Sequence, residues 1–294
     1  MQNQFSRIQL LVGKPAIDTL HGSRVAVFGV GGVGGYVVEV LARSGVGHID
    51  VWDDDRFCPS NCNRQILATA STIGQSKVDV AEARIHDIYP ECIVRKHQCF
   101  YLPSNAHLFD LSQYDYVVDC IDTVTAKLDI IRRCHDLNVP LISCMGAAYK
   151  LDATQWCVTD IFKTINDPLA KVIRKKLRKT PVKHVKVVYS PEEPIASIAQ
   201  PLPDGTDPHA EARPGAAHPS TPSSAAWVVG TAGLLCGGEV VKDLIRRANT
   251  MRIDLTQDPD NAYAQAAALK AAAHDEEYSK MKHARGCVKI HTLF

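Results

Sequence analysis

A valine-rich run that stops at a group of glycines constrains the fold of this chain more than any other feature. The run covers residues 25–28, and from residue 35 to residue 43 the apolar positions take up helical spacing. Four glycines stand between the two stretches: Gly29, Gly31, Gly32 and Gly34. A short apolar run closed by glycine is typical of a strand buried on both faces, so the stretch predicts strand, tight turn and helix. We therefore expect an α/β fold: a Rossmann-like, mostly parallel sheet with helices on both faces, extended by additional strands.

The glycine turn predicts a phosphate site. Small residues let a phosphate approach the first N–H groups of the helix, where unpaired donors and the helix dipole favour negative charge. A second predicted strand, residues 48–52, ends in Asp53, about 20 residues beyond the glycines, where a carboxylate can accept hydrogen bonds from a ribose. These features indicate a dinucleotide or ATP, and the alternative is a glycine-rich turn that binds nothing.

A polar loop just downstream distinguishes between a dinucleotide and ATP as the ligand. The stretch SNCNRQ places a hydroxyl, amides and a guanidinium together, and its candidate ligands are Ser60, Asn61, Asn63 and Arg64. Lys77 follows in the first turn of a helix predicted over residues 76–89. The glycine turn can hold the pyrophosphate of a nicotinamide cofactor largely by itself, whereas a triphosphate needs cations, which Arg64 and Lys77 supply. The loop therefore favours ATP.

Later strands are expected at residues 92–99, near a sheet edge, at 114–121, at 139–145 and at 154–159. Asp122 and Thr123 follow the strand at 114–121 and precede a helix that runs to about residue 137. Since ligands of open α/β sheets bind beyond the carboxyl ends of the strands, we expect Asp53 and Asp122 to converge there with the glycine turn. Asp122 has two compatible interpretations: it caps the helix, or it holds Mg²⁺, usually through water.

The order of these motifs resembles the ATP-dependent adenylyltransferases related to ubiquitin-activating enzymes, the thiamine/molybdopterin adenylyltransferase superfamily. The similarity covers about residues 5–194 and includes GxGGVG, the strand before Asp53, SNxNRQ, Gly74-x-x-Lys77 and the stretch DCID at residues 119–122. The segment TDIFKTINDPLAKVIRKKLRK, residues 159–179, is similar to one branch, the tRNA threonylcarbamoyladenosine dehydratases. That resemblance implies a ligase that uses ATP to adenylate the carboxylate of threonylcarbamoyladenosine in tRNA and promotes its cyclisation, releasing AMP and pyrophosphate.

The resemblance also implies roles for particular residues. ATP would be bound by the four glycines, Asp53, Ser60, Asn61, Asn63, Arg64, Lys77, Asp122 and Thr123. The catalytic residues would be Arg64, Lys77 and Asp122, with Mg²⁺ on Asp122, and Arg7 would reach the ATP site of the neighbouring subunit in a homodimer. The same branch implies a monovalent cation near residues 146–148 and a cysteine desulfurase or sulfur acceptor system as a partner.

Two other classes of enzyme share parts of this pattern. An adenylyltransferase for a ubiquitin-like sulfur carrier protein would use the same nucleotide site, but it is expected to carry zinc-binding cysteines and often a cysteine in a loop over the site. The ten cysteines here include no CxxC pair, and residues 199–224 contain none, so we expect no zinc. An NAD-dependent oxidoreductase would leave SNCNRQ and Lys77 without a role.

Composition limits the partners and the location. A formal net charge of +1 gives no general attraction to RNA, so a tRNA contact is assigned to residues 163–186, where nine lysines and arginines stand against one acid, Asp167. The N-terminus has no signal-peptide pattern, and the apolar stretch at 227–247 is interrupted too early by charges to span a bilayer. We expect reduced cysteines and a cytoplasmic location. The expected division is an adenylation domain, 1–247, with a flexible loop at about 199–224, and a tail of unknown role, 248–294.

Overall fold

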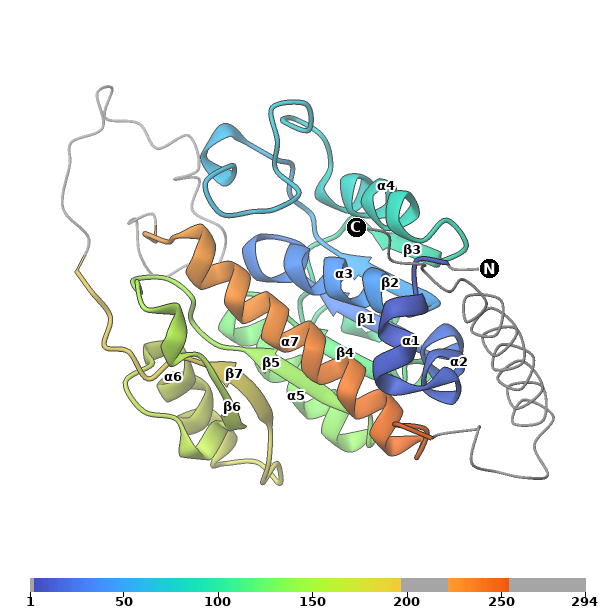
Figure 1. Cartoon of the computed structure of the whole chain (residues 1–294). Helices are drawn as coiled ribbons and strands as arrows, with labels where there is room; N and C mark the ends of the chain where they lie inside the picture. Colours follow the sequence, from blue (N-terminus) through green and yellow to red (C-terminus); the bar gives the residue numbers. More distant parts are fainter. Residues whose placement is uncertain (1–2, 197–221, 254–294) are drawn as a thin grey trace, which may run out of the picture.

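The computed structural model describes residues 3–196 and 222–253, and these contain one sheet with helices on both faces (Figure 1). The strands are β1 (Arg24–Phe28), β2 (His48–Trp52), β3 (Ile93–His97), β4 (Tyr116–Asp119), β5 (Leu141–Cys144), β6 (Cys157–Asp160) and β7 (Lys186–Tyr189). Their order is β3-β2-β1-β4-β5-β7-β6, and every pair is parallel except β6 with β7. The α/β class, the mostly parallel sheet and its extra strands are therefore confirmed.

The helices cover the two faces unequally. One face carries α2 (Lys14–Gly22), α3 (Gly32–Ser44), α4 (Lys77–Ile88) and α7 (Ala226–Arg247), with α1 (Ser6–Val12) beside α2. The other face carries α5 (Val124–Asp136) and α6 (Pro168–Leu177). Short 3-10 turns lie at Pro59–Asn61, Ala106–Leu108, Leu111–Gln113, Ala153–Gln155 and Ile161–Lys163. Val27 of β1 packs in one core and Phe28 in the other, which explains why β1 is apolar from Val25 onward.

The chain changes direction across the sheet between β1 and β4. From β1 it steps to β2 and β3 on one side, and it then returns to β4 and continues to β5 on the other side. The turns that follow β1 and β4 lie against each other, because the N–H of Cys120 donates to the carbonyl of Phe28 at 2.8 Å. A switch point of this kind opens a crevice at the carboxyl ends of the strands, where ligands bind.

Several element boundaries differ from those that the sequence predicts. α3 begins at Gly32, three residues early, and the strand predicted at 114–121 is ordered as a strand only over Tyr116–Asp119. The prediction at 154–159 is wrong at its start, where a 3-10 turn stands, and β6 runs antiparallel. β3 lies at the edge as expected. Thr123, not Asp122, occupies the N-cap position of α5, so the capping interpretation of Asp122 is wrong.

Two predictions fall mainly outside the described residues. The loop expected at 199–224 is described only from residue 222, and the tail at 248–294 only to residue 253. The expected boundary at residue 247, between the adenylation domain and the tail, stays a prediction. Within 3–196 and 222–253, no helix is both long enough and apolar enough to cross a bilayer.

Candidate active site

The glycine turn brings the end of β1 and the start of α3 into contact. Gly29 has φ +86°, and a Cβ on Gly34 would lie 1.7 Å from the carbonyl oxygen of Gly29, so both positions require glycine. Gly31 is the N-cap of α3 and Gly32 is its first residue, and within residues 3–196 and 222–253 no side chain caps this end of the helix. The first N–H groups of α3 are therefore available to an anion at the carboxyl edge of the sheet.

Asp53 lies against this turn, as predicted. One carboxylate oxygen accepts from the N–H of Val30 at 2.9 Å, and the other accepts from the N–H of Asp55 at 3.0 Å. Burial raises the pKa of Asp53, and the nearby Lys77 charge and the two N–H donors oppose that rise. A carboxylate held in this way keeps lone pairs for a ribose hydroxyl.

Lys77 is the first residue of α4, as predicted, but its side chain is only 6% exposed. Its ammonium lies 2.8 Å from Asp55 and 3.8 Å from Asp53. Asp55, two residues after Asp53, is therefore the main partner of Lys77. Lys77 thus lies beneath the carboxylates of the site and is not a freely exposed cation.

The polar loop at residues 60–65 divides into structural and outward-facing groups. Asn61 is buried and accepts from the N–H of Cys58, which holds the loop together. Arg64 donates to the carbonyl of Ser60 at 2.9 Å and to the side chain of Asn63 at 3.0 Å, while Asn63 donates to the carbonyl of Ser224 at 3.0 Å. Arg64 is half-buried, and a single guanidinium nitrogen, Nη1, makes both of its contacts.

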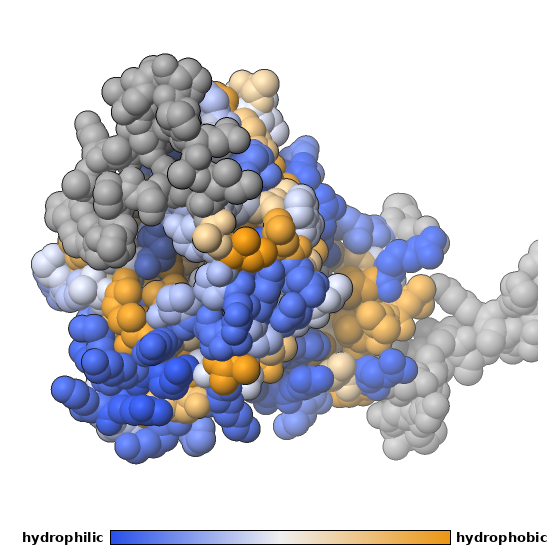
Figure 2. All heavy atoms as spheres, turned by 90° about the vertical axis from the view of Figure 1, so that its left-hand side faces the viewer, coloured by the Kyte–Doolittle hydropathy of each residue, from blue (hydrophilic) through white to orange (hydrophobic). Residues whose placement is uncertain are grey.

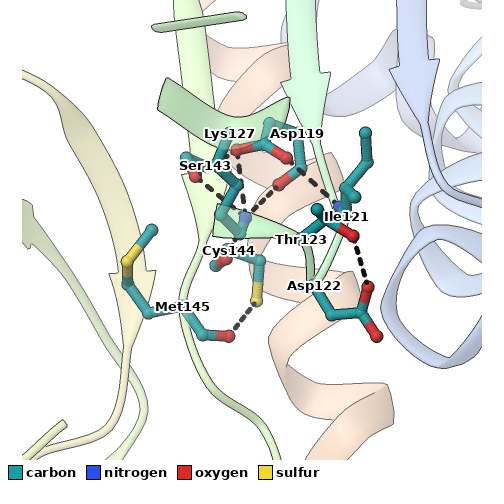
Figure 3. A network of polar contacts seen from close by, with 8 residues as sticks. All are labelled: Asp119, Ile121, Asp122, Thr123, Lys127, Ser143, Cys144 and Met145. Carbon is teal, nitrogen blue, oxygen red and sulfur yellow. Dashed lines mark hydrogen bonds and ion pairs between the residues drawn. The ribbon is translucent and has the colours of Figure 1, made fainter. Parts of the chain in front are cut away.

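Asp122 and Thr123 lie at the end of β4, beside the same crevice. Asp122 is exposed, and its carboxylate contacts only the Thr123 hydroxyl, at 3.4 Å, among the described residues (Figure 3). An exposed carboxylate at a carboxyl strand edge fits a hydrated Mg²⁺. Asp53, Asp54 and Asp55 also bring ligand atoms within 4.8 Å of one another, although Lys77 already neutralises part of their charge.

The structure does not bring Arg7 into the site of its own chain. Arg7 is exposed on α1, and the neighbouring Phe5 packs on Tyr89 and reaches the Cβ position of Gly45, at the far end of α3. A helix of 13 residues is about 20 Å long. The glycine turn stands at the other end of that helix, so Arg7 could act only on another subunit.

Two groups in this region were not predicted. Gln65 is buried, its Oε1 has no hydrogen-bond partner in the described structure, and its amide lies 3.7–3.9 Å from the Cβ position of Gly31. Asp119 and Lys127 form a fully buried ion pair at 3.0 Å. Lys127 occupies the apolar stripe of α5, spaced three and four residues from Ile130 and Ile131, and a lysine in such a stripe is the sequence signal that could have revealed it.

Comparison with known proteins agrees with this geometry. A model described as the ThiF family matches residues 3–284. The chain belongs to the ThiF family. A tRNA threonylcarbamoyladenosine dehydratase of Bacillus subtilis is 45% identical over 254 residues, which cover 86% of this chain and 99% of that relative. The resemblance drawn from the motifs is therefore confirmed.

Solved structures of a similar protein contain ATP or AMP. The Escherichia coli tRNA N6-threonylcarbamoyladenosine dehydratase, solved in complexes with ATP and with AMP, is 32% identical, with a TM-score of 0.72 and coverage of 84% of this chain and 95% of that one. A molybdopterin-synthase adenylyltransferase of Escherichia coli is 33% identical over 141 residues, covering 46% of this chain and 53% of its own length. The similarity to dehydratases thus extends over much more of the chain.

Proposed function

We propose that this ThiF family protein is an ATP-dependent tRNA threonylcarbamoyladenosine dehydratase. The observation that carries the proposal is the 45% identity with the Bacillus subtilis dehydratase, which extends over 99% of that relative. The glycine turn, Asp53, Arg64 and Asp122 supply the groups that adenylation of a carboxylate requires, at one edge of the sheet.

The proposed reaction has two steps. A carboxylate oxygen of the threonyl group attacks the α-phosphorus of ATP, and pyrophosphate leaves. The carbamoyl group then attacks the acyl carbon of the adenylate and loses a proton, and AMP leaves with the oxygen that belonged to the carboxylate. The product is the cyclic form of the modified base, which has formally lost water.

Residues of this chain position the nucleotide and balance its charge. The N–H groups at the start of α3 would hold phosphate oxygens, and Asp53 would hold the ribose. Arg64 would neutralise charge on the leaving pyrophosphate, while Lys77 acts from beneath through Asp53 and Asp55. Gln65 adds an amide oxygen beside Gly31 that has no partner among the described residues and that a ligand could satisfy.

Two cations belong to the proposal. Mg²⁺ would be held by Asp122, largely through water, and would supply further neutralisation of phosphate charge. A monovalent cation near residues 146–148 rests only on the resemblance. Close to that segment the ammonium of buried Lys150 already donates to the carbonyls of Ser190 and Glu192, at 3.1 and 2.7 Å.

The alternative is activation of the C-terminus of a ubiquitin-like sulfur carrier protein. Its support is the shorter match to the molybdopterin-synthase adenylyltransferase. Pyrophosphate release measured with ATP and threonylcarbamoyladenosine tRNA, with a sulfur carrier protein, and with neither separates the two. We expect release only with the tRNA, accompanied by cyclised product, and release only with the carrier protein would replace our proposal with the alternative.

The basic segment at residues 163–186 supports a tRNA contact, with a correction to its membership. Arg174 donates to Thr164, and Lys186 pairs with Glu239 and Asp243, so both have internal roles. Seven basic residues of the segment are exposed: Lys163, Lys171, Lys175, Lys176, Arg178, Lys179 and Lys183. Figure 2, which faces this side of the molecule, shows a broad hydrophilic region interrupted by apolar patches. We propose that these exposed cations contact tRNA phosphates.

Replacing Lys175, Lys176 and Lys179 with glutamine tests this contact. We expect weaker tRNA binding and a salt dependence that flattens, in the log–log slope, by up to about 0.7–0.9 for each phosphate that the variant no longer neutralises, with ATP binding unchanged. A matched triple variant elsewhere on the surface, with glutamine at Arg95, Arg132 and Arg246, carries the same change in charge. Equal effects of the two triple variants would refute a localised RNA surface.

A homodimer with a shared site is also proposed, because Arg7 lies about one length of α3 away from its own glycine turn. Mixing an Arg7→Ala subunit with an Asp122→Ala subunit should restore activity, since one site of each heterodimer then has both residues intact. Asp122 suits this test because it is exposed. Absence of rescue in a sample shown to exchange subunits would contradict the shared site.

Two further predictions complete the proposal. The nine cysteines in the described residues are all free, which supports a reducing, cytoplasmic location. A cysteine desulfurase or sulfur acceptor system as partner rests on the family resemblance alone. Co-purification of this protein with a cysteine desulfurase, compared with a control from which this protein is omitted, would test the partnership.

A further inference from the structure

A buried polar network joins β4, β5 and α5 beside the turn that carries Asp122 and Thr123 (Figure 3). The ammonium of Lys127 donates to the Asp119 carboxylate at 3.0 Å, to the Ser143 hydroxyl at 3.2 Å and to the carbonyl of Cys144 at 2.7 Å. The Ser143 hydroxyl donates to the same carboxylate oxygen at 2.6 Å. All three charged or hydroxyl-bearing side chains are 0% exposed.

Every donor in the network has an acceptor. The three N–H groups of the ammonium face the Asp119 carboxylate, the Ser143 hydroxyl and the Cys144 carbonyl, with a longer contact of 3.5 Å to the Asp119 carbonyl. The serine accepts from Lys127 while it donates to Asp119. The other oxygen of Asp119 accepts from the N–H of Ile121 at 3.2 Å. A buried network that is fully satisfied fixes the position of the segments that it joins.

The segment fixed in this way carries Asp122. Ile121 immediately precedes Asp122, and the carbonyl oxygen of Cys120 lies 3.0 Å from the Cβ position of Gly29. The network therefore reaches both the exposed carboxylate and the glycine turn through a single stretch of backbone. Among the described residues, Asp122 itself makes no contact that would hold it, apart from the one to Thr123.

We propose that Lys127 and Asp119 are positioning residues, which hold the turn at residues 120–123 so that Asp122 meets the metal and phosphates of bound ATP. The inference rests on the function proposed above. Stability alone does not require such a pair, because apolar residues of similar volume often replace a buried ion pair at no cost in stability. The directed bond to the N–H of Ile121 is what an apolar replacement cannot supply.

A triple variant, Asp119→Leu, Lys127→Met and Ser143→Ala, removes the network without leaving an unpaired charge. We expect a folded protein whose segment 120–123 exchanges amide hydrogens faster than in the natural chain. With a non-hydrolysable ATP analogue, Mn²⁺ affinity measured by electron paramagnetic resonance should fall about tenfold or more, as it does when groups that orient metal ligands are removed. Turnover should fall in parallel and recover partly at high Mg²⁺, whereas Asp122→Ala should lower Mn²⁺ affinity without such recovery.

Hydrogen exchange and Mn²⁺ affinity equal to those of the natural chain would overturn the inference. If the triple variant does not fold, Ser143→Ala carries the test, because it removes one hydrogen bond and no charge. We expect about a threefold decrease of Mn²⁺ affinity for that variant, and an unchanged value overturns the inference. Absence of tRNA-dependent pyrophosphate release in the natural chain would refute the proposed function. Hydrogen exchange and Mn²⁺ affinity would still test whether the network positions residues 120–123.

Discussion

Replacing Lys77 with alanine should lower both turnover and stability. The sequence alone predicts a decrease of turnover with the fold intact, because it places Lys77 at a ligand-facing edge. The structure instead buries this lysine between two carboxylates, 2.8 Å from Asp55 and 3.8 Å from Asp53. The variant leaves both acids without their cation, so a structural cost must accompany the catalytic one.

The geometry sets the size of that cost. At an effective dielectric constant of about 20, two unit charges at these distances attract by about 6 and about 4 kcal/mol before desolvation is subtracted. Removing one partner of a buried pair costs about 3–5 kcal/mol, and the 31% exposure of Asp55 screens part of it. We expect the free energy of unfolding to fall by about 2–3 kcal/mol, which lowers the Tm by about 3–5 °C for a chain of this size.

The cost should also depend on pH. Burial raises the pKa of Asp53 and the Lys77 charge opposes the rise, so the variant has an even higher folded-state pKa at Asp53. A carboxyl whose folded pKa lies above its unfolded value binds its proton more tightly in the folded state, and stability then falls as pH rises through the folded pKa. The Tm difference between the natural chain and the variant should therefore be larger at pH 8 than at pH 5.

Thermal unfolding and single-turnover adenylation, the latter well below the Tm, measure the two effects separately. Lys96→Ala is the matched control, because Lys96 also pairs with two carboxylates, Asp79 and Glu82, but is 34% exposed and should cost less than about 1 kcal/mol. A Tm decrease no larger than that of the control would refute the buried-pair reasoning. Turnover within about threefold of the natural chain would refute the role of Lys77 in adenylation.

Three further predictions follow from single positions. Gly34→Ala should destabilise the protein by about 3 kcal/mol or more, because its Cβ would lie 1.7 Å from a carbonyl oxygen. Gly238→Ala in α7, whose Cβ would meet no described atom within 4 Å, should stabilise it by about 0.5–1 kcal/mol, and calorimetry that finds the two variants alike would contradict this. Gln65→Met should leave the Tm unchanged or higher, because the amide oxygen of Gln65 lacks a partner in the described structure. The same variant should weaken ATP binding about fivefold in titration calorimetry, and an unaltered ATP affinity would argue against a ligand contact. Asp50→Asn should lower the Tm at pH 7, and the Tm difference from the natural chain should shrink as pH falls below 3.8. Burial raises the pKa of Asp50, but its hydrogen-bond donors lower that pKa overall, so the stabilisation is present above the ordinary pKa and disappears below the folded-state pKa. A Tm difference that does not depend on pH would refute that account.

The sequence determined the fold class, and it was enough to propose where a nucleotide would bind, because the decisive signals are local. A strand of valines, glycines that only one backbone path tolerates and a helix with regular spacing specify the β1–α3 unit within about twenty residues. Asp53, Arg64, Lys77 and Asp122 could be named because each follows directly from a motif at the end of a strand or the start of a helix.

What only the tertiary structure decided depends on contacts between distant segments. The partner of Lys77 is Asp55, 22 residues earlier, and the partners of Lys127 lie on two different strands. Arg174 and Lys186 look like free cations in the sequence, but they are held by Thr164 and by two acids of α7. Spacing along the chain gives the type and the face of a side chain, whereas the burial and neutralisation of its charge depend on the packing of segments that the sequence pattern does not relate to one another.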